Sequence, residues 1–326
     1  MSNRSVEKTR NRLKKLIEDG SHYEAHQQLR VLCQRYLKQE NYPAAIDIVF
    51  TGATSLLKAG QSGSGGDLCL LLLSVYRDGG VKPTSESKGR IYQLLNLLPT
   101  EEPTRKRFLN EAVAWSAKNG EYPNGDPDLH HFIGNLLAGE DEAYAAEKHL
   151  LLGTKESAEV LGQLLYRWYA ADDSFKVGHY AARAVLPYLL LNNVRDANKV
   201  LDIFSSNLTE NNKNLTNSLV ESMTSEIRVF PSLPLFNFLR LLVLTVERGQ
   251  ADTFRNLRSH YASHLNDVPD WNEALDQIGE IYFDIQIRRQ QNLLDMMGSM
   301  FGGGGPAQPS GRPRLQAAAP SSAELD

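Results

Sequence analysis

The sequence predicts an all-α protein, a right-handed α-solenoid of stacked TPR-like helical hairpins with one short β-hairpin inserted in its C-terminal half. Three observations support this fold class. Apolar residues recur at helical spacing from about residue 6 to about residue 301. Alternation typical of strands occurs in one short segment only. A turn followed by a small residue and an apolar stripe recurs along the chain, near Gly20, Glu40, Glu140, Asn192 and Arg248.

The small residue in each of these signals is an alanine near the start of a helix. A small side chain there lets two helix axes approach closely, and helix pairs that recur in this way bury their apolar faces by stacking on their neighbours. The alanines are Ala25, Ala44, Ala145, Ala197 and Ala251.

The N-terminal helices are delimited by recognisable end signals. A first apolar stripe starts near Val6 and ends before Gly20, a residue suited to a helix C-cap. A second helix is expected at residues 23–37. Asn41 is placed to cap a third helix that runs to about residue 59, with Pro43 in its first turn, where the missing N–H has no cost.

A glycine- and serine-rich segment at residues 60–66 is expected to be a loop between repeats. The residues from Asp67 onward are almost all apolar, which predicts a helix buried on most sides. Further apolar stripes predict helices at residues 86–97, 102–118, 128–138, 141–152, 155–169, 175–191 and 194–207. Pro187 is expected to kink or interrupt its helix.

The pattern changes after residue 208. A polar, asparagine-rich stretch leads into β-branched and aromatic residues at 227–230, which predicts a β-hairpin within residues 219–230 and a turn near 223–225. Helices are expected again at residues 235–247, 251–264, 272–289 and around 293–297. Residues 302–326 are rich in Gly, Pro, Ala and Ser and predict a disordered tail.

Composition limits the partners and the compartment. The 326-residue chain carries a net charge of -4, which argues against a general nucleic-acid binder. The longest apolar run, residues 233–246, is interrupted by Pro234, Asn237 and Arg240, so no direct membrane insertion is expected. Two cysteines, Cys33 and Cys69, lie within apolar helical stripes and predict buried thiols in a reducing compartment.

No motif predicts catalysis, a cofactor or a metal site. The segment before Asp67 lacks the Lys-Ser/Thr of a phosphate-binding loop. His22 with His26, and His260 with His264, each share a helix face but have no third ligand nearby in sequence. The neighbouring His130 and His131 are expected to cap a helix or to lie at the surface. The sequence therefore predicts a protein that is not an enzyme.

Four stretches together resemble one family. They are YEAHQQLR at Tyr23, AIDIVFTGATSLLKAGQSGSGGDL at Ala45, GDPDLHHFIGNLLAGEDEAYAAEKHLLLGT at Gly125 and QNLLDMMGSMFGG at Gln291. They are similar to the fourth subunit of the Guided Entry of Tail-anchored proteins (GET) pathway, a family that includes the thirty-five-kilodalton subunit of the mammalian transmembrane-recognition complex. The resemblance extends over about residues 6–303.

The resemblance implies a cytosolic scaffold for post-translational insertion of tail-anchored proteins into the endoplasmic reticulum membrane. Residues 1–152 would bind the dimeric targeting ATPase, transiently and in its ATP-bound form. Residues 153–301 would hold a ubiquitin-like partner constitutively. Through that partner the scaffold would act with a glutamine-rich TPR cochaperone and promote client handover to the ATPase.

The resemblance implies an ATPase site at the N-terminal end, where Lys8, Lys38 and Asp67 match the family's ATPase-facing motif. This end is also locally basic, and a basic patch suits an acidic protein surface. The residues expected at the ATPase site are Lys8, Tyr23, His26, Arg30, Lys38 and Asp67. Some fungal relatives have a glutamate two turns after the aspartate, where this chain has Ser74.

The expected site for the ubiquitin-like partner is an exposed apolar patch of the hairpin and the helix after it, because apolar residues there exceed what these two elements would bury alone. Its residues are expected to be Ile227, Val229, Phe230, Leu235, Phe236 and Leu239. Two alternatives remain open. The hairpin could cap the helical stack, and the chain could be a helical-repeat subunit of a proteasome-lid or signalosome-type assembly.

Overall fold

A computed structural model describes residues 11–13, 15–172, 176–221 and 226–285. The expected contact residue Lys8, the expected hairpin turn at 223–225, the helix expected around 293–297 and the tail 302–326 lie outside the described residues. Residues 11–13 and 15–18 are helical and are followed by a turn at Gly20 with a φ of 81°.

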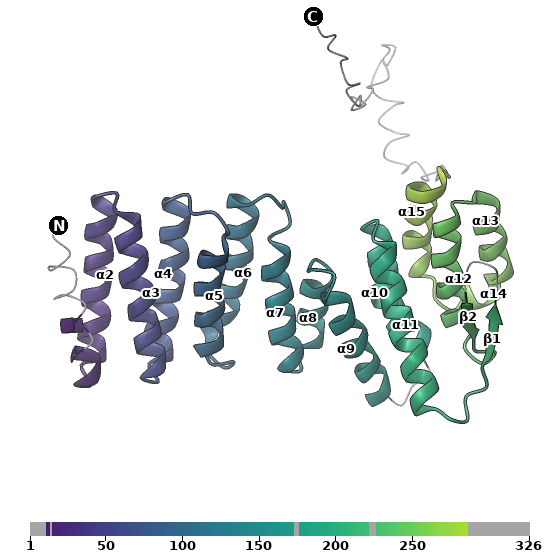
Figure 1. The fold of residues 1–326 in the computed structure, drawn as a ribbon, viewed down its shortest axis with the longest axis horizontal. Coiled ribbons are helices and arrows are strands. Elements are labelled where there is room, and N and C mark those ends of the chain that lie inside the picture. Colours follow the sequence, from purple (N-terminus) through teal and green to yellow (C-terminus); the bar gives the residue numbers. More distant parts are fainter. Residues whose placement is uncertain (1–10, 14, 173–175, 222–225, 286–326) are drawn as a thin grey trace, which may run out of the picture. The chain divides into compact units, whose positions relative to one another are not determined.

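The described residues up to Ile285 form one compact unit, in which nearly every element is a helix (Figure 1). The elements are α2 (His22–Lys38), α3 (Tyr42–Lys58), α4 (Ser62–Asp78), α5 (Ser85–Leu97), α6 (Pro103–Asn119), α7 (Pro127–Gly139), α8 (Ala143–Leu150), α9 (Ser157–Ala171), α10 (Val177–Leu190), α11 (Val194–Asn211), β1 (Ser218–Glu221), β2 (Glu226–Val229), α12 (Pro234–Arg248), α13 (Ala251–His260), α14 (Ala262–Leu265) and α15 (Trp271–Phe283).

Most helices pack on a neighbour in the chain and on a helix of the next pair. Thus α2 contacts α3 and α4, α4 contacts α6, α9 contacts α11 and α10 contacts α12 (Figure 1). The core is continuous through the stack, from Leu29 and Leu72 through Trp115 to Phe204 and Leu242, all fully buried. The predicted all-α fold of stacked helical hairpins is confirmed.

The cap predicted for the third helix is present, and a second asparagine acts in the same way. The Asn41 side chain accepts a hydrogen bond from Ala44 N at 3.3 Å, and Pro43 lies in the first turn of α3. Asn193 accepts one from Asp196 N at 3.2 Å and begins α11. These caps satisfy N–H groups that the first turn of a helix leaves without a partner.

Gly60 and Gln61 of the segment expected to be a loop precede α4, but residues 62–66 instead form the first turn and a half of this helix. Tight packing explains this. A Cβ on Gly65 would lie 2.5 Å from the Leu57 side chain, and one on Gly66 would lie 2.1 Å from Thr104 Oγ1. The glycines therefore let α4 approach α3 and α6 closely, and this tertiary contact overrides their low helix propensity. Asp67 lies in the second turn of the helix and not at its start.

Pro187 lies inside α10 and does not interrupt it. Two further expectations at helix ends are wrong. The helix expected at 251–264 breaks after His260, and the short α14 follows. The helix expected to reach residue 289 ends at Phe283, because Asp284 adopts a left-handed φ of 52°.

The predicted hairpin is confirmed. Strands β1 and β2 are antiparallel, with Ser218 opposite Val229 and Val220 opposite Ile227. Among the described residues they form the only sheet, and it has two strands.

Ion pairs link successive helix pairs. Lys88 of α5 is buried, and its Nζ donates to Asp126 Oδ1 at 2.9 Å and to Asp128 Oδ2 at 2.7 Å, at the start of α7. Hydrogen bonds to these two carboxylates outweigh the opposing effect of burial and raise the pKa of Lys88. Further links of this kind are Arg77–Glu111, Arg105–Glu140, Glu147–Arg183 and Asp202–Arg240.

Candidate functional site: two protein-binding surfaces

The first candidate surface is formed by one face of α2 and the adjoining face of α4. Side chains spaced three or four residues apart lie on the same face of a helix. On α2 this face carries Tyr23, Gln27, Arg30, Val31, Gln34 and Lys38, and on α4 it carries Asp67, Leu71 and Ser74. We refer to these nine residues as the α2–α4 surface.

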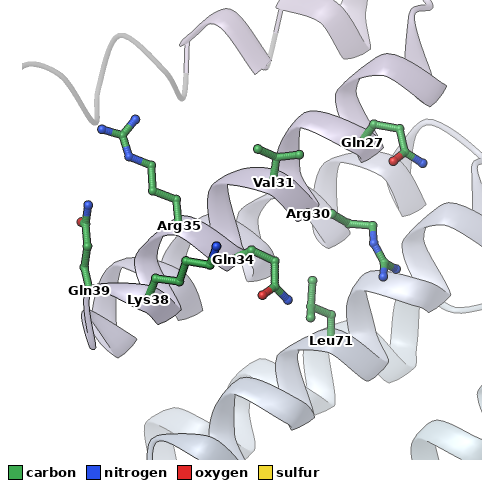
Figure 2. A pocket seen from close by; sticks show the side chains of 8 residues that line it. All are labelled: Gln27, Arg30, Val31, Gln34, Arg35, Lys38, Gln39 and Leu71. Atoms are coloured by element: carbon green, nitrogen blue, oxygen red, sulfur yellow. The ribbon is translucent and has the colours of Figure 1, made fainter.

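A groove of about 590 Å³ lies on this surface (Figure 2). Val31 and Leu71 provide its apolar part, and Val31 is 67% exposed. Cationic and amide side chains surround it, from Gln27, Arg30, Gln34, Arg35, Lys38 and Gln39. The groove therefore combines an apolar contact with positive charge.

Asp67 connects the two helices of this surface. His26 Nε2 lies 2.8 Å from Asp67 Oδ2 and donates to it, and Arg30 Nη1 donates to the same oxygen. Partial burial would raise the pKa of Asp67, but the hydrogen bonds from Arg30 and His26 outweigh it and hold the pKa below its usual value. The carboxylate is thus ionised at neutral pH and still 40% exposed.

The structure brings five of the six residues expected at the ATPase site together. Tyr23, His26, Arg30, Lys38 and Asp67 all lie on α2 or the adjoining part of α4, and the sixth, Lys8, is outside the described residues. The sequence analysis missed Gln27, Val31, Gln34 and Leu71. Continuing the spacing of four residues from Tyr23 along α2 would have found the first two.

At the C-terminal end, the expected apolar patch is wrong for three of its six residues. Phe230, Phe236 and Leu239 are buried in the core and cannot be reached by a partner. The Phe230 and Phe236 rings lie 5.8 Å apart between centroids. Asn237 closes the junction, since its side chain accepts from Phe230 N at 3.0 Å and donates to Phe230 O at 2.7 Å. Phe230 directly follows β2, and its buried ring packs against Phe236 of α12.

The other three expected residues, Ile227, Val229 and Leu235, are partly exposed, and two of them lie in different pockets. Ile227 lines a groove of about 550 Å³ between the hairpin, α12 and α13. We call it the hairpin groove, and its other lining residues are Leu241, Leu244, Thr245, Arg248, Thr253, Asn256, Leu257, His260 and Tyr261. Leu235 lines a separate, smaller pocket beside Gly178. On β1, Leu219 and Val220 are about half exposed, which the sequence analysis did not single out.

His130 is not the capping or surface residue that was expected. It is buried, its Nδ1 lies 3.0 Å from Nδ1 of His149, and its Nε2 lies 3.0 Å from Asn124 O. Burial lowers the pKa of both imidazoles, that of His149 to about 4. The pair is therefore a neutral hydrogen-bonded contact between α7 and α8. Among the described residues, no group of three or more His, Cys, Asp or Glu side chains is placed to hold a metal ion.

Comparison with known proteins gives the family. A sequence model of Golgi to ER traffic protein 4 matches residues 39–301, which is most of the chain. The chain belongs to the Golgi to ER traffic protein 4 family. It is 48% identical to Golgi to ER traffic protein 4 of Aspergillus fumigatus, over 98% of this chain and 99% of that protein. It is 35% identical to the Schizosaccharomyces pombe protein of the same name, over 86% of this chain and 91% of that one.

The fold of a family member is similar as well. A crystal structure of C. therm. Get4 superposes with a TM-score of 0.84 at 48% identity, covering 92% of this chain and 96% of that one. Membership of the Golgi to ER traffic protein 4 family assigns the chain to the GET pathway and favours this interpretation over a proteasome-lid or signalosome subunit. None of the described helices has the length and hydropathy that crossing a bilayer requires.

Proposed function

We propose that the chain is a cytosolic, non-enzymatic scaffold that bridges the tail-anchored-protein targeting ATPase and a ubiquitin-like partner, and so promotes client handover. Residues 1–152 would bind the ATPase and residues 153–301 the ubiquitin-like partner, which works with the glutamine-rich TPR cochaperone. The observation that carries the proposal is the face of α2, where large apolar side chains are exposed next to a row of cations.

Tyr23 is 76% exposed and Val31 is 67% exposed on that one face. Large apolar side chains grouped at the surface are typical of an interface, and aromatic anchors account for much of the binding energy in interfaces. Arg30, Arg35 and Lys38 add positive charge around them. Charge of one sign around an apolar centre suits an acidic protein surface and speeds association.

A charge-reversal experiment tests the ATPase contact. Lys38→Glu and Arg35→Glu should each weaken binding to the ATP-bound ATPase by about tenfold, mainly through slower association, and make binding less sensitive to salt. Lys58→Glu, an exposed lysine at the end of α3, is the matched control. Equal affinities for all three variants and the parent chain would refute the assignment.

The hairpin groove supports the proposed site for the ubiquitin-like partner. It has an apolar wall of Ile227, Leu241, Leu244 and Leu257 between two helices and a strand, an arrangement that accepts an amphipathic helix. Leu244→Asp should abolish co-purification of this partner and leave ATPase binding intact. Leu191→Asp changes a half-exposed leucine elsewhere and serves as the control. If the Leu244→Asp variant still co-purifies with the ubiquitin-like partner, the assignment of the partner's site to the hairpin groove is wrong.

A further inference from the structure

A third surface lies on α8 and α9, outside both surfaces described above. Tyr144 of α8 is 64% exposed, and its ring lies edge-on to that of Trp168 of α9, with centroids 4.5 Å apart. The guanidinium of Arg183, from α10, lies 5.0 Å from the Tyr144 centroid and 4.9 Å from the Trp168 centroid. One guanidinium therefore contacts both rings.

Arg183 is itself neutralised within the stack. Its Nε donates to Glu147 Oε2 at 2.8 Å, so its charge is balanced by a residue of α8. The two rings are fixed by three helices before any partner arrives. A fixed aromatic pair loses little conformational entropy on binding, which favours recognition.

The rings line a groove of about 520 Å³ between the start of α8 and the end of α9. Ala143, Leu164 and Ala171 provide its apolar lining. Asp141 and Glu142 lie at one rim, and their side chains form no ion pair with the residues that the structure describes. We call this the aromatic groove.

The charges around the aromatic groove indicate its occupant. The lining of the groove carries two negative charges, of Asp141 and Glu142, against the single positive charge of Arg167. This excess disfavours nucleic acid and anionic lipid headgroups. Aromatic faces attract ammonium and guanidinium groups, and the apolar lining accepts an aliphatic side chain.

We propose that the aromatic groove is a docking site for a short basic segment of a partner protein, in which arginine or lysine stands next to an apolar residue. The cation stacks on Tyr144 or Trp168 and lies near Asp141 and Glu142, while the apolar residue enters the groove. The site uses neither the α2–α4 surface nor the hairpin groove, so its failure would leave the proposed function untouched.

Trp168 provides the signal for a direct test on the full chain. The chain has three tryptophans, of which Trp115 is fully buried and Trp271 is largely buried. The probe is a synthetic peptide of about ten residues that alternates arginine with leucine and proline, long enough to span the groove. We expect saturable quenching of tryptophan fluorescence that Trp168→Phe removes, and binding that weakens as salt is added.

Two variants and their controls decide the outcome. The double variant Asp141→Lys/Glu142→Lys should weaken binding of the peptide by about tenfold, and Tyr144→Ala should do the same. Glu101→Lys/Glu121→Lys makes the same change of net charge at exposed sites elsewhere, and Tyr122→Ala removes another half-exposed tyrosine. Both controls should bind the peptide like the parent chain.

Three results would overturn the proposal. The first is equal affinity for the peptide in the Asp141→Lys/Glu142→Lys variant and in its control, Glu101→Lys/Glu121→Lys. The second is tighter binding of a matched peptide with glutamate in place of arginine, which would assign the groove to Arg167 and an acidic partner. The third is a concentration-dependent dimer of the peptide-free chain that Tyr144→Ala dissociates, because a second copy would then be the occupant.

Discussion

Asp67 Oδ2 accepts hydrogen bonds from two side chains of α2, one from His26 Nε2 at 2.8 Å and one from Arg30. The two donors are four residues apart and so lie on one face of α2. One carboxylate of α4 thus links two positions of α2 to α4. The same carboxylate is at the surface that we assign to the ATPase, so it contributes both to the shape of that surface and to its charge.

Replacing Asp67 should separate binding from stability. Asp67→Ala should change the free energy of unfolding by less than about 1 kcal/mol, because Asp67 and Arg30 are both well exposed and exposed ion pairs contribute little. Affinity for the ATPase should fall by about tenfold, since Arg30 is no longer held in place. Denaturant titration and binding kinetics measure the two effects, with the exposed Asp78→Ala of the same helix as control.

Removing the buried cation of α5, Lys88, should lower the free energy of unfolding far more than Asp67→Ala does. Lys88→Met leaves Asp126 buried without its counter-ion and should destabilise the chain by about 3 kcal/mol. Lys82→Met changes an exposed lysine of the preceding loop and should have almost no effect. In urea denaturation, similar midpoints for both variants would show that the Lys88–Asp126 pair contributes no stability.

Two glycines of α4 should respond to alanine in opposite directions. Gly66→Ala places a Cβ 2.1 Å from Thr104 Oγ1, and this overpacking should cost about 1–3 kcal/mol. Gly63→Ala meets no atom within 4 Å and should stabilise the chain by up to about 1 kcal/mol, through lower entropy of the unfolded state. Thermal unfolding of the two variants measures both changes, and destabilisation by Gly63→Ala would contradict the packing argument.

The buried histidine pair should make stability depend on pH. The pKa values of His130 and His149 are lower in the folded chain than in the unfolded chain, so the unfolded chain takes up protons first as the pH falls. Stability from this pair is complete above about pH 6.5 and should decline from there toward the folded pKa of about 4 for His149.

Urea midpoints between about pH 7.5 and 5 measure this decline. His149→Gln should flatten the profile, whereas His260→Gln, at an exposed position, should leave it unchanged. A slope that survives in His149→Gln would assign the pH dependence to other groups.

Shortening the hairpin should remove one partner only. A short Asn-Gly turn in place of residues 219–228 joins Ser218 to Val229, which already face each other, and keeps Phe230 in the core. The ubiquitin-like partner should be lost from co-purification while ATPase binding stays. If the partner is retained, the hairpin is a structural cap of the stack. A deletion that extends through Phe230 would also open the core and could not distinguish these outcomes.

The sequence predicted the helices well, because periodicity and caps such as Asn41 are local signals. It failed where a distant contact decides the conformation. The glycines of α4 are helical because of Leu57 and Thr104, and His130 is buried against a residue nineteen positions away. An apolar stripe in the sequence also does not distinguish a core from an interface. Phe230, Phe236 and Leu239 are therefore expected at an interface from the sequence but lie in the core of the structure.

For the candidate site, the resemblance to the family supplied Lys38 and Asp67, and the basic patch supplied Arg30. The pairing of Asp67 with His26 spans 41 positions and could be found only in three dimensions. The aromatic groove was missed for a similar reason. Tyr144, Trp168 and Arg183 come from three helices, and nothing in their local sequence indicates that they meet.

The ion pairs between successive helix pairs have a consequence for how binding sites communicate. Each of them joins a helix only to the next pair, as Arg105–Glu140 and Glu147–Arg183 do. In such an array the free energy of folding is nearly the sum of contributions from each repeat and from contacts between adjacent repeats. A structural change at one end should therefore die out within a repeat or two. Occupation of the hairpin groove should then leave the intrinsic affinity of the α2–α4 surface unchanged, with a coupling free energy close to zero. The molecule would act by holding its ligands near one another, with additive rather than allosteric binding.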